Sequence, residues 1–188
     1  DIGSGFGLFI EELIKINNVK LNIEAIEPSK KMASICREKG IVVKEDMLEN
    51  LVDKTDKYDL LTTFELFEHL HDPILFLNDC YNLLNPGGYI YLTTLNSHGF
   101  DIQMLWEKSN SIFPPHHLNF FNPISMDKIM SLVGFNNIEI TTPGELDIDI
   151  VRNTSLKDNV QLPRFMSSLY SYYSDDVLNN FQLFLKNN

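Results

Sequence analysis

Asp1-Ile2-Gly3-Ser4-Gly5-Phe6-Gly7 places an acidic residue ahead of three glycines at alternate positions. Glycines spaced in this way let the backbone turn sharply out of a strand, and they leave no Cβ between a ligand and the main chain. The dinucleotide fingerprint of dehydrogenases has the spacing G-x-G-x-x-G, whereas Leu8 stands where its third glycine would be. The stretch therefore predicts a strand that ends in a nucleotide-binding loop of a different type. A plain helix-entry loop is the competing interpretation.

The composition predicts a single globular domain over residues 1–188. Hydrophobic residues make up 44% and aromatic residues 11% of the chain, which is enough for a sizeable core. The formal net charge of -11 disfavours a nucleic-acid partner, because nucleic-acid affinity rests largely on Lys and Arg side chains that neutralise phosphates. We expect a small-molecule partner instead, and the composition predicts no oligomeric state.

The cysteines and histidines bear on location and metal binding. Cys36 and Cys80 lack the spacing of a metal site and are expected to be reduced thiols of a cytoplasmic protein. No signal-peptide pattern and no run of about eighteen apolar residues occurs, so neither secretion nor a membrane partner is expected. The histidine pairs, His69 with His71 and His116 with His117, lack further ligands at a set spacing, so no metal site is predicted.

Strand and helix patterns alternate through the first half of the chain. The predicted helices span 8–16, 28–38 and 73–84, the predicted strands 19–27, 41–43, 58–64 and 89–94, and a turn is expected at 85–88. Such alternation implies right-handed βαβ units. The predicted fold class is therefore α/β, with a three-layer, doubly wound and mainly parallel sheet.

Ile2 is the one apolar residue before the glycine loop, although a buried parallel strand reads as a run of several. We therefore expect an apolar run of about four to six residues upstream of Asp1. On this interpretation the sequence is a fragment that lacks most of its first strand.

The alternation stops after Asn96. Residues 97–119 hold the single tryptophan, Trp106, two adjacent prolines and the pair His116-His117, and such an interruption often covers a site. His117, or failing that His116, is the predicted general base, because imidazole titrates near neutrality. The competing interpretation is that one histidine covers the site and the other is solvated. The rest of the chain predicts a helix at 123–133, a strand at 137–141 and amphipathic helices within 155–188.

Acidic residues follow the predicted strands. Glu27 closes the second one, where a doubly wound fold can place an acid that accepts hydrogen bonds from both ribose hydroxyls of a nucleotide. The alternative for Glu27 is a carboxylate favoured by the following helix dipole. Asp46 follows the third strand and is also a plausible N-cap for residues 48–52. Glu65, Glu68 and His69 follow the fourth strand at i, i+3 and i+4, which predicts one shared helical face, either at the site or solvated.

These features together resemble the class I S-adenosylmethionine (SAM) dependent methyltransferases over roughly residues 1–140. The glycine loop resembles their motif I, and Glu65-Leu66-Phe67-Glu68-His69 resembles their Glu-x-x-Glu-His segment, with Asp72-Pro73 downstream. Leu84-Asn85-Pro86-Gly87-Gly88 resembles the turn before their fifth strand. The branch is similar to the small-molecule O-methyltransferases of ubiquinone biosynthesis. A departure is that no strand follows the terminal helix, where the family ends its sheet with an antiparallel hairpin.

The resemblance implies an enzyme that moves a methyl group from SAM to a small-molecule acceptor, with a hydroxyl oxygen as the expected acceptor atom. Asp46 would meet the adenine amino group, Phe64 and Glu65 would lie beside the sulfonium, and residues 97–119 would form the acceptor side. The implied cofactor-binding residues are Asp1, Gly3, Gly5, Gly7, Glu27, Pro28, Asp46, Met47, Phe64 and Glu65. The alternatives are a non-catalytic methyltransferase-like interaction protein and an NAD(P)-dependent oxidoreductase, which the early third glycine disfavours.

Overall fold

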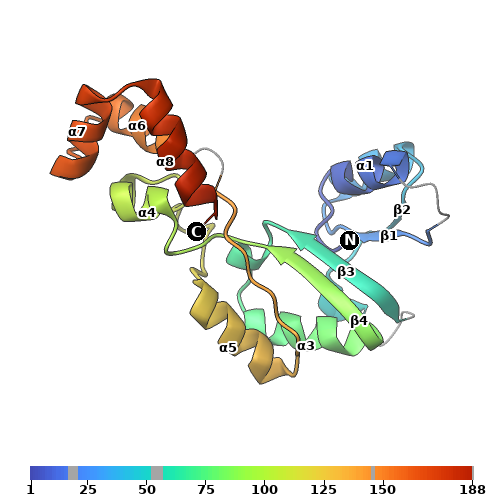
Figure 1. The fold of residues 1–188 in the computed structure, drawn as a ribbon. Coiled ribbons are helices and arrows are strands. Elements are labelled where there is room, and N and C mark those ends of the chain that lie inside the picture. Colours follow the sequence, from blue (N-terminus) through green and yellow to red (C-terminus); the bar gives the residue numbers. More distant parts are fainter. Residues whose placement is uncertain (17–20, 52–56, 145–146, 188) are drawn as a thin grey trace. The chain divides into compact units, whose positions relative to one another are not determined.

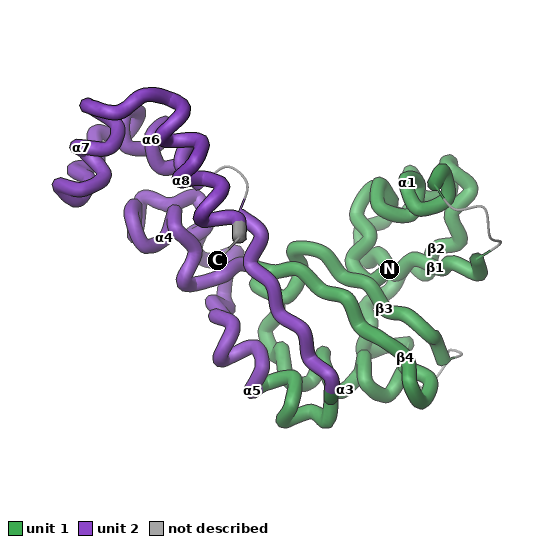
Figure 2. Tube along the Cα trace, in the orientation of Figure 1, with its two compact units in different colours: residues 1–94, 129–136 green, residues 95–128, 137–188 purple. Residues whose placement is uncertain are grey.

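The structure is a computed structural model that describes residues 1–16, 21–51, 57–144 and 147–187. The chain divides into two compact units, which Figure 2 shows in different colours. Unit 1 comprises residues 1–94 and 129–136, and unit 2 comprises residues 95–128 and 137–188. Helix α5, Pro123–Val133, contributes its first part to unit 2 and its last part to unit 1.

The strands of unit 1 form two parallel pairs, β1 with β2 and β3 with β4 (Figure 1). Ile2 makes parallel bridges to Ile26 on β1 and to Thr63 on β3, so this one residue lies between the two pairs. The resulting order, β2-β1-Ile2-β3-β4, confirms the parallel α/β arrangement that the sequence predicts. The strands are β1 (Glu24–Ile26), β2 (Val42–Lys44), β3 (Tyr58–Phe64) and β4 (Leu84–Thr93).

Capping residues set the start of two helices in unit 1. The Ser29 hydroxyl accepts the backbone N–H of Met32, and the Asp72 carboxylate accepts that of Leu75, as N-cap side chains do. Proline at the first position of α3 loses no intrahelical hydrogen bond there. All three predicted helices are present: the one at 8–16 matches to the residue, the one at 28–38 starts two residues later, and the one at 73–84 ends one residue earlier. The helices are α1 (Leu8–Ile16), α2 (Lys30–Glu38) and α3 (Pro73–Leu83), with short 3-10 turns η1 (Leu48–Asn50) and η3 (Phe67–His69).

An apolar cluster in unit 1 joins α1, β1 and α2. Its buried members come from all three elements and from the residue before β2: Ile10, Ala25, Cys36 and Ile41. A cavity of about 300 Å³ lies between β1 and β3, lined mostly by residues of 21–26 and 57–62 together with apolar side chains of α1. Ile2 also lines this cavity, so the space adjoins the one residue that bridges the two strand pairs.

The turn expected at 85–88 lies inside β4. Tyr58 pairs with Leu84 and Leu60 pairs with Tyr89, so four residues stand opposite the single Asp59 and bulge from the strand. The side-chain amide of Asn85 donates to the Asp59 carboxylate at 2.9 Å and holds the bulge in place. The predicted turn is real, but the strand begins before it rather than after it.

The regular elements of unit 2, over its described residues, are helices, and one isolated parallel bridge joins Asn96 to Phe121. Helix α6 packs against α4 and α8, and Ile148, Met166, Leu169 and Leu178 form its buried cluster. The C-terminal helices begin at residue 147, earlier than the predicted 155. The elements are α4 (Phe100–Leu105), the 3-10 turn η4 (Trp106–Lys108), α6 (Asp147–Lys157), α7 (Arg164–Tyr172) and α8 (Asp175–Asn187). Among the described helices, none combines the length and the apolar character that a membrane crossing requires.

The strand predicted at 137–141 is wrong, because residues 137–141 have no strand conformation. Asn137, the first residue of the run, has a φ of +54°, which turns the backbone out of the extended region at that point. Pairing with a neighbouring strand is what stabilises an extended segment, and no ladder partner is recorded for this segment among the described residues.

Candidate functional site

The carboxylate of Glu27 joins the glycine loop to the end of β1 and the start of α2. Its Oε2 accepts the backbone N–H of Gly5 at 2.7 Å, and its Oε1 accepts the backbone N–H of Ser29 at 2.8 Å. Glu27 is only 5% exposed, so this charge is buried against two main-chain donors. Each carboxylate oxygen can accept a second hydrogen bond, which would suit the paired hydroxyls of a ribose. Pro28, which lies between Glu27 and Ser29, is exposed.

Gly5 and Gly7 serve different purposes in the loop. Both have a left-handed backbone, with φ of +54° and +71°, a conformation that a side chain disfavours. A Cβ on Gly5 would meet no atom within 4 Å, so the main chain is open to an approaching ligand there. A Cβ on Gly7 would lie 2.6 Å from Cδ1 of Ile41 and 3.0 Å from the Cys36 sulfur, so this glycine is required by packing.

Asp1 and Gly3 are fixed by the neighbouring strands. The hydroxyl of Thr62 on β3 donates to the Asp1 carboxylate at 2.9 Å, and the backbone N–H of Gly3 donates to the Ile26 carbonyl of β1 at 2.9 Å. A Cβ on Gly3 would lie 3.0 Å from the Leu66 side chain. The structure therefore brings Asp1, the glycines and Glu27 together at the ends of β1 and β3.

Asp46 and Met47 lie just after β2. The Asp46 carboxylate accepts the Met47 backbone N–H at 2.8 Å and the Asn50 side-chain amide at 2.7 Å. Met47, not Asp46, occupies the N-cap position of η1, so the predicted N-cap role of Asp46 is wrong. Because η1 starts at Leu48, the residue directly before it is Met47, and the Asp46 carboxylate accepts the backbone N–H of Met47 instead. Met47 itself is 48% exposed.

Phe64 and Glu65 follow one another at the end of β3. The Phe64 ring lies 4.6 Å from the Phe9 ring and 5.7 Å from the Tyr91 ring, measured between centroids. Glu65 is exposed and has a φ of +50°, which is strained for a residue with a side chain. The Thr93 hydroxyl donates to its carboxylate at 2.7 Å. Glu65 is thus held in a costly backbone conformation beside an aromatic cluster. Backbone strain of this kind concentrates at functional sites.

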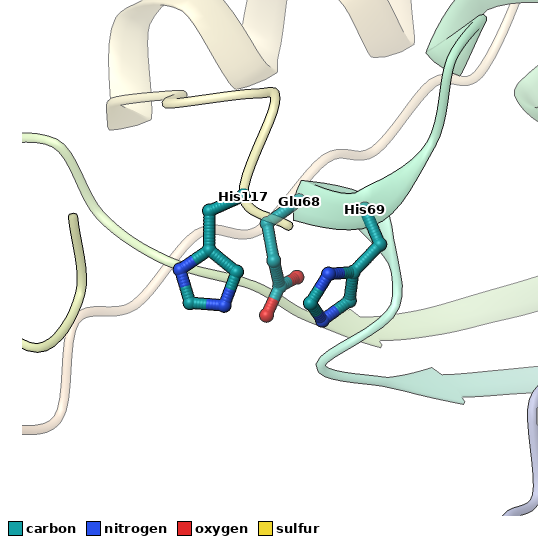
Figure 3. Close-up of side chains that lie close together, drawn as sticks. All are labelled: Glu68, His69 and His117. Atoms are coloured by element: carbon teal, nitrogen blue, oxygen red, sulfur yellow. The ribbon is translucent and has the colours of Figure 1, made fainter. Parts of the chain in front are cut away.

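Glu65, Glu68 and His69 do not share a helical face, which corrects the prediction from their spacing. The helical turn η3 is a single 3-10 turn that begins at Phe67, after the left-handed Glu65. Glu68 is 2% exposed and accepts the Thr94 hydroxyl at 2.9 Å, whereas His69 is exposed. Figure 3 shows these two side chains leaving the turn at adjacent positions.

The predicted bases belong to unit 2. His117 is half-buried, and its Nδ1 lies 2.8 Å from the Ser111 carbonyl oxygen. The exposed His116 stacks on the Phe113 ring with centroids 5.0 Å apart, and the His117 ring meets Phe113 edge-on at 6.2 Å. Figure 3 labels His117 on its loop. The hydrogen bond between Nδ1 and the Ser111 carbonyl sets the orientation of the His117 ring.

Glu24 has a different role from Glu27. Its carboxylate accepts the Tyr58 hydroxyl in a very short hydrogen bond and the Lys44 ammonium at 2.9 Å. The Tyr58 hydroxyl and then Lys44 hold the pKa of the Glu24 carboxyl below its usual value. The Glu24 carboxylate therefore bonds to Tyr58 and Lys44 and not to the glycine loop.

The residues that position the acids carry no signal in the sequence. Thr62, Thr93 and Thr94 bond to Asp1, Glu65 and Glu68, and the Cys36 thiol donates to the Gly5 carbonyl at 3.3 Å. Threonine is common in strands, so nothing in its spacing marks these positions. Thr63 is also buried, and its hydroxyl has no hydrogen-bond partner among the described residues.

Comparisons with known proteins find similar sequences among enzymes named as O-methyltransferases. The ubiquinone biosynthesis O-methyltransferase of Parvibaculum lavamentivorans is 33% identical over 109 residues, covering 54% of this chain and 43% of the relative. The enzyme of the same name from Vibrio parahaemolyticus is 26% identical over 152 residues, covering 75% of this chain and 64% of the relative. The chain thus spans about half to two thirds of the length of these relatives.

Solved structures of methyltransferases have the same fold. A SAM-dependent methyltransferase of Thermotoga maritima, described as a possible histamine N-methyltransferase, matches with a TM-score of 0.58 and 27% identity, covering 72% of this chain and 62% of that one. A plantazolicin methyltransferase solved with S-adenosylhomocysteine (SAH) has a TM-score of 0.60 at 17% identity, covering 88% and 71%, which supports the fold alone. The model of the methyltransferase domain family matches residues 1–140, and the chain belongs to this family.

Proposed function

We propose that the chain binds SAM at the glycine loop and transfers its methyl group to a small-molecule acceptor, with a hydroxyl oxygen as the acceptor atom. The observation that carries this proposal is the open main chain at Gly5 beside the buried Glu27 carboxylate. A loop without a Cβ and a fixed acid at the end of β1 suit a nucleoside ligand. Family membership and the O-methyltransferase names of the relatives support the same proposal.

The residues present fit the cofactor at three places. Glu27 would accept hydrogen bonds from the ribose hydroxyls, and Asp46 would accept one from the adenine amino group. The Phe64 ring and the Glu65 carboxylate would stabilise a sulfonium, because aromatic faces and carboxylates attract cations. Asp1, Gly3, Gly7, Pro28 and Met47 complete the proposed binding set. When bound, the cofactor supplies an electrophilic methyl group.

Residues 97–119 form the proposed acceptor side, with His117 as the proposed general base and His116 as the second choice. The Ser111 carbonyl can only accept a hydrogen bond, so Nδ1 of His117 carries a proton and Nε2 carries the lone pair of the neutral ring. Nε2 could then take the proton of an acceptor hydroxyl as the methyl group arrives. Positioning of the acceptor is expected to supply most of the rate enhancement.

Two buried cysteines support the cytoplasmic location that we propose. Cys36 and Cys80 are both free thiols, and burial raises the pKa of the Cys80 thiol, which makes it unreactive. Free thiols are typical of proteins in a reducing compartment.

The decisive experiment is a calorimetric titration of the chain with SAH. Glu27→Ala should weaken binding by about 1.5–3 kcal/mol, the usual scale for hydrogen bonds to a charged group. Glu24→Ala is the matched control and should change SAH affinity little, since its carboxylate bonds to Tyr58 and Lys44 instead. Equal effects of the two substitutions would contradict the assignment of Glu27. Binding of NADH in place of SAH would favour the oxidoreductase alternative, and SAH binding without methyl transfer to any hydroxyl acceptor would favour the non-catalytic one.

A further inference from the structure

Asp101, in the first turn of α4, is the centre of a hydrogen-bond cluster in the loop that carries His117. One oxygen of its carboxylate, Oδ2, accepts both the Ser109 hydroxyl and the Ser111 hydroxyl, the latter at 2.8 Å. The Ser109 hydroxyl also accepts the backbone N–H of Ser111 at 3.0 Å. Ser109 is only 2% exposed, and Asp101 and Ser111 are half-buried. Together these three bonds fix the turn at residues 109–111.

The start of this turn is held in a strained conformation. Trp106 has a φ of +49°, although it carries a bulky side chain, and its carbonyl accepts the Ser109 backbone N–H at 2.9 Å. A residue stays in such a region only where the surrounding contacts determine its conformation. Hydrogen bonds to a carboxylate are stronger than those between neutral groups, and Asp101 supplies two of them. The carboxylate therefore compensates for backbone strain at Trp106, three residues before Ser109.

The fixed turn presents one group to His117, the main-chain carbonyl of Ser111. Its oxygen lies 2.8 Å from Nδ1 of the ring. The hydrogen bond that one ring nitrogen makes decides which tautomer the other nitrogen shows. A carbonyl aimed at Nδ1 selects the tautomer with the proton on Nδ1 and the lone pair on Nε2.

We propose that Asp101 is a positioning residue that sets the tautomer of His117 through Ser109 and Ser111. The functional consequence rests on the proposed function, in which the Nε2 lone pair of His117 takes the acceptor proton. Asp101 itself does not touch the ring. Its carboxylate accepts the hydroxyls of Ser109 and Ser111 and so fixes their turn. The turn places the Ser111 carbonyl, which accepts the proton on Nδ1 of His117.

The test is nitrogen NMR of the His117 ring in the chain without ligand, at about pH 8, where an ordinary histidine is neutral. The unsubstituted chain should show the Nδ1-protonated tautomer. Asp101→Ala should give a mixture of tautomers, and Asp101→Asn, which keeps a carbonyl acceptor, should restore much of the original signature. Asp127→Ala, an exposed carboxylate on α5, is the matched control and should leave the signature unchanged. An unaltered Nδ1 signature in Asp101→Ala would overturn the proposal.

Two further measurements extend this test, and the first of them keeps the proposal testable if Asp101→Ala folds poorly. Ser111→Ala removes one hydroxyl and keeps the carbonyl, so it should shift the tautomer part of the way while circular dichroism stays unchanged. In a methyl-transfer assay Asp101→Ala should lower kcat by roughly 10-fold to 100-fold, part of the 10²–10⁴-fold that a general base contributes. KM for SAM should stay within about twofold, because Asp101 is not among the proposed cofactor-binding residues. If the tautomer shifts and kcat does not, His117 is not the base, and the positioning role of Asp101 stands without the proposed function.

Discussion

The two units of the chain hold their key side chains in different ways. In unit 1 the Glu27 carboxylate is fixed by two main-chain N–H groups, and the positions of those groups follow from strand bridges and helix starts. In unit 2 the His117 ring is fixed through a network of side chains that begins at Asp101. The first arrangement should change only when the backbone changes, whereas the second should respond to single side-chain substitutions. On the proposed function, substitutions in unit 2 should therefore alter the acceptor side and leave the cofactor side in unit 1 intact.

The largest expected effect is that of Gly7→Ala on the backbone-built unit. The new methyl group would enter the space of Ile41 and Cys36, at a φ that also disfavours alanine. Strain of about 1–2 kcal/mol and overpacking of about 1–3 kcal/mol predict a loss of about 2–5 kcal/mol in the free energy of unfolding. Urea denaturation measures it.

Gly5→Ala is the matched control for that experiment. Its backbone is equally left-handed, but its Cβ would meet no atom, so only the strain of about 1–2 kcal/mol is expected. Gly5→Ala should instead weaken SAH binding, because the methyl group would lie on the open face of the loop. Equal losses of stability in the two variants would show that packing at Gly7 is not critical.

The histidines test the side-chain-built unit. His117→Ala should lower turnover by roughly 10²-fold or more and leave SAH affinity within about twofold, because the ring is proposed to act on the acceptor alone. His116→Ala should have a smaller effect, since that ring stacks on Phe113 at the surface. Steady-state kinetics with a hydroxyl acceptor measures both. Unchanged turnover in both variants would leave positioning of the acceptor as the whole mechanism.

The cavity between β1 and β3 gives a third test, this time of the sheet. An extension of four apolar, β-branched residues placed before Asp1 should enter the cavity as a parallel strand beside Ile2. Burial of an apolar side chain contributes about 1.5–3 kcal/mol and ordering a residue costs about 1.5 kcal/mol, so the extension should raise the thermal stability of the chain. A Gly-Ser extension of the same length is the control. Equal thermal stability of the two extended chains would show that the cavity does not accept a strand.

Sequence patterns predict unit 1 well because its elements carry local signals. The helix at 8–16 and the strand at 58–64 match the structure to the residue, since apolar periodicity and end signals agree there. The prediction of a strand at 137–141 fails because β-branched residues only favour an extended backbone, whereas a strand also requires a neighbouring strand to pair with. The register that turns residues 85–88 into a bulge is likewise set by the pairing of β4 with β3, which no local pattern records.

The residues of the candidate site likewise differ in how well the sequence predicts them. Glycines and strand-end acids are visible in the sequence because few residue types can replace them, and the structure brings Asp1, Gly5 and Glu27 together. The supporting network of Asp101, Ser109 and Ser111 has no such signal. Common polar residues acquire a role there only through the path of the loop.

The smallest expected effect concerns the Glu24 carboxylate, which is linked to Tyr58 and Lys44 across unit 1. The Tyr58 hydroxyl and Lys44 lower the pKa of Glu24 in the folded chain, so its charged form stabilises the fold at pH values above the ordinary glutamate pKa of about 4.3. That contribution is lost as the pH falls through the lowered pKa.

Glu24→Gln should therefore cost about 1 kcal/mol at pH 7, the scale of a partly exposed ion pair. The difference between the two chains should shrink as the pH falls below about 4. Urea denaturation at a series of pH values measures this difference in the free energy of unfolding. Tyr58→Phe should reduce the pH-dependent part of the stability that Glu24 contributes, because the Tyr58 hydroxyl is the larger cause of the lowered pKa. A difference that stays constant down to pH 3 would show that Glu24 stabilises the fold through packing and not through its charge.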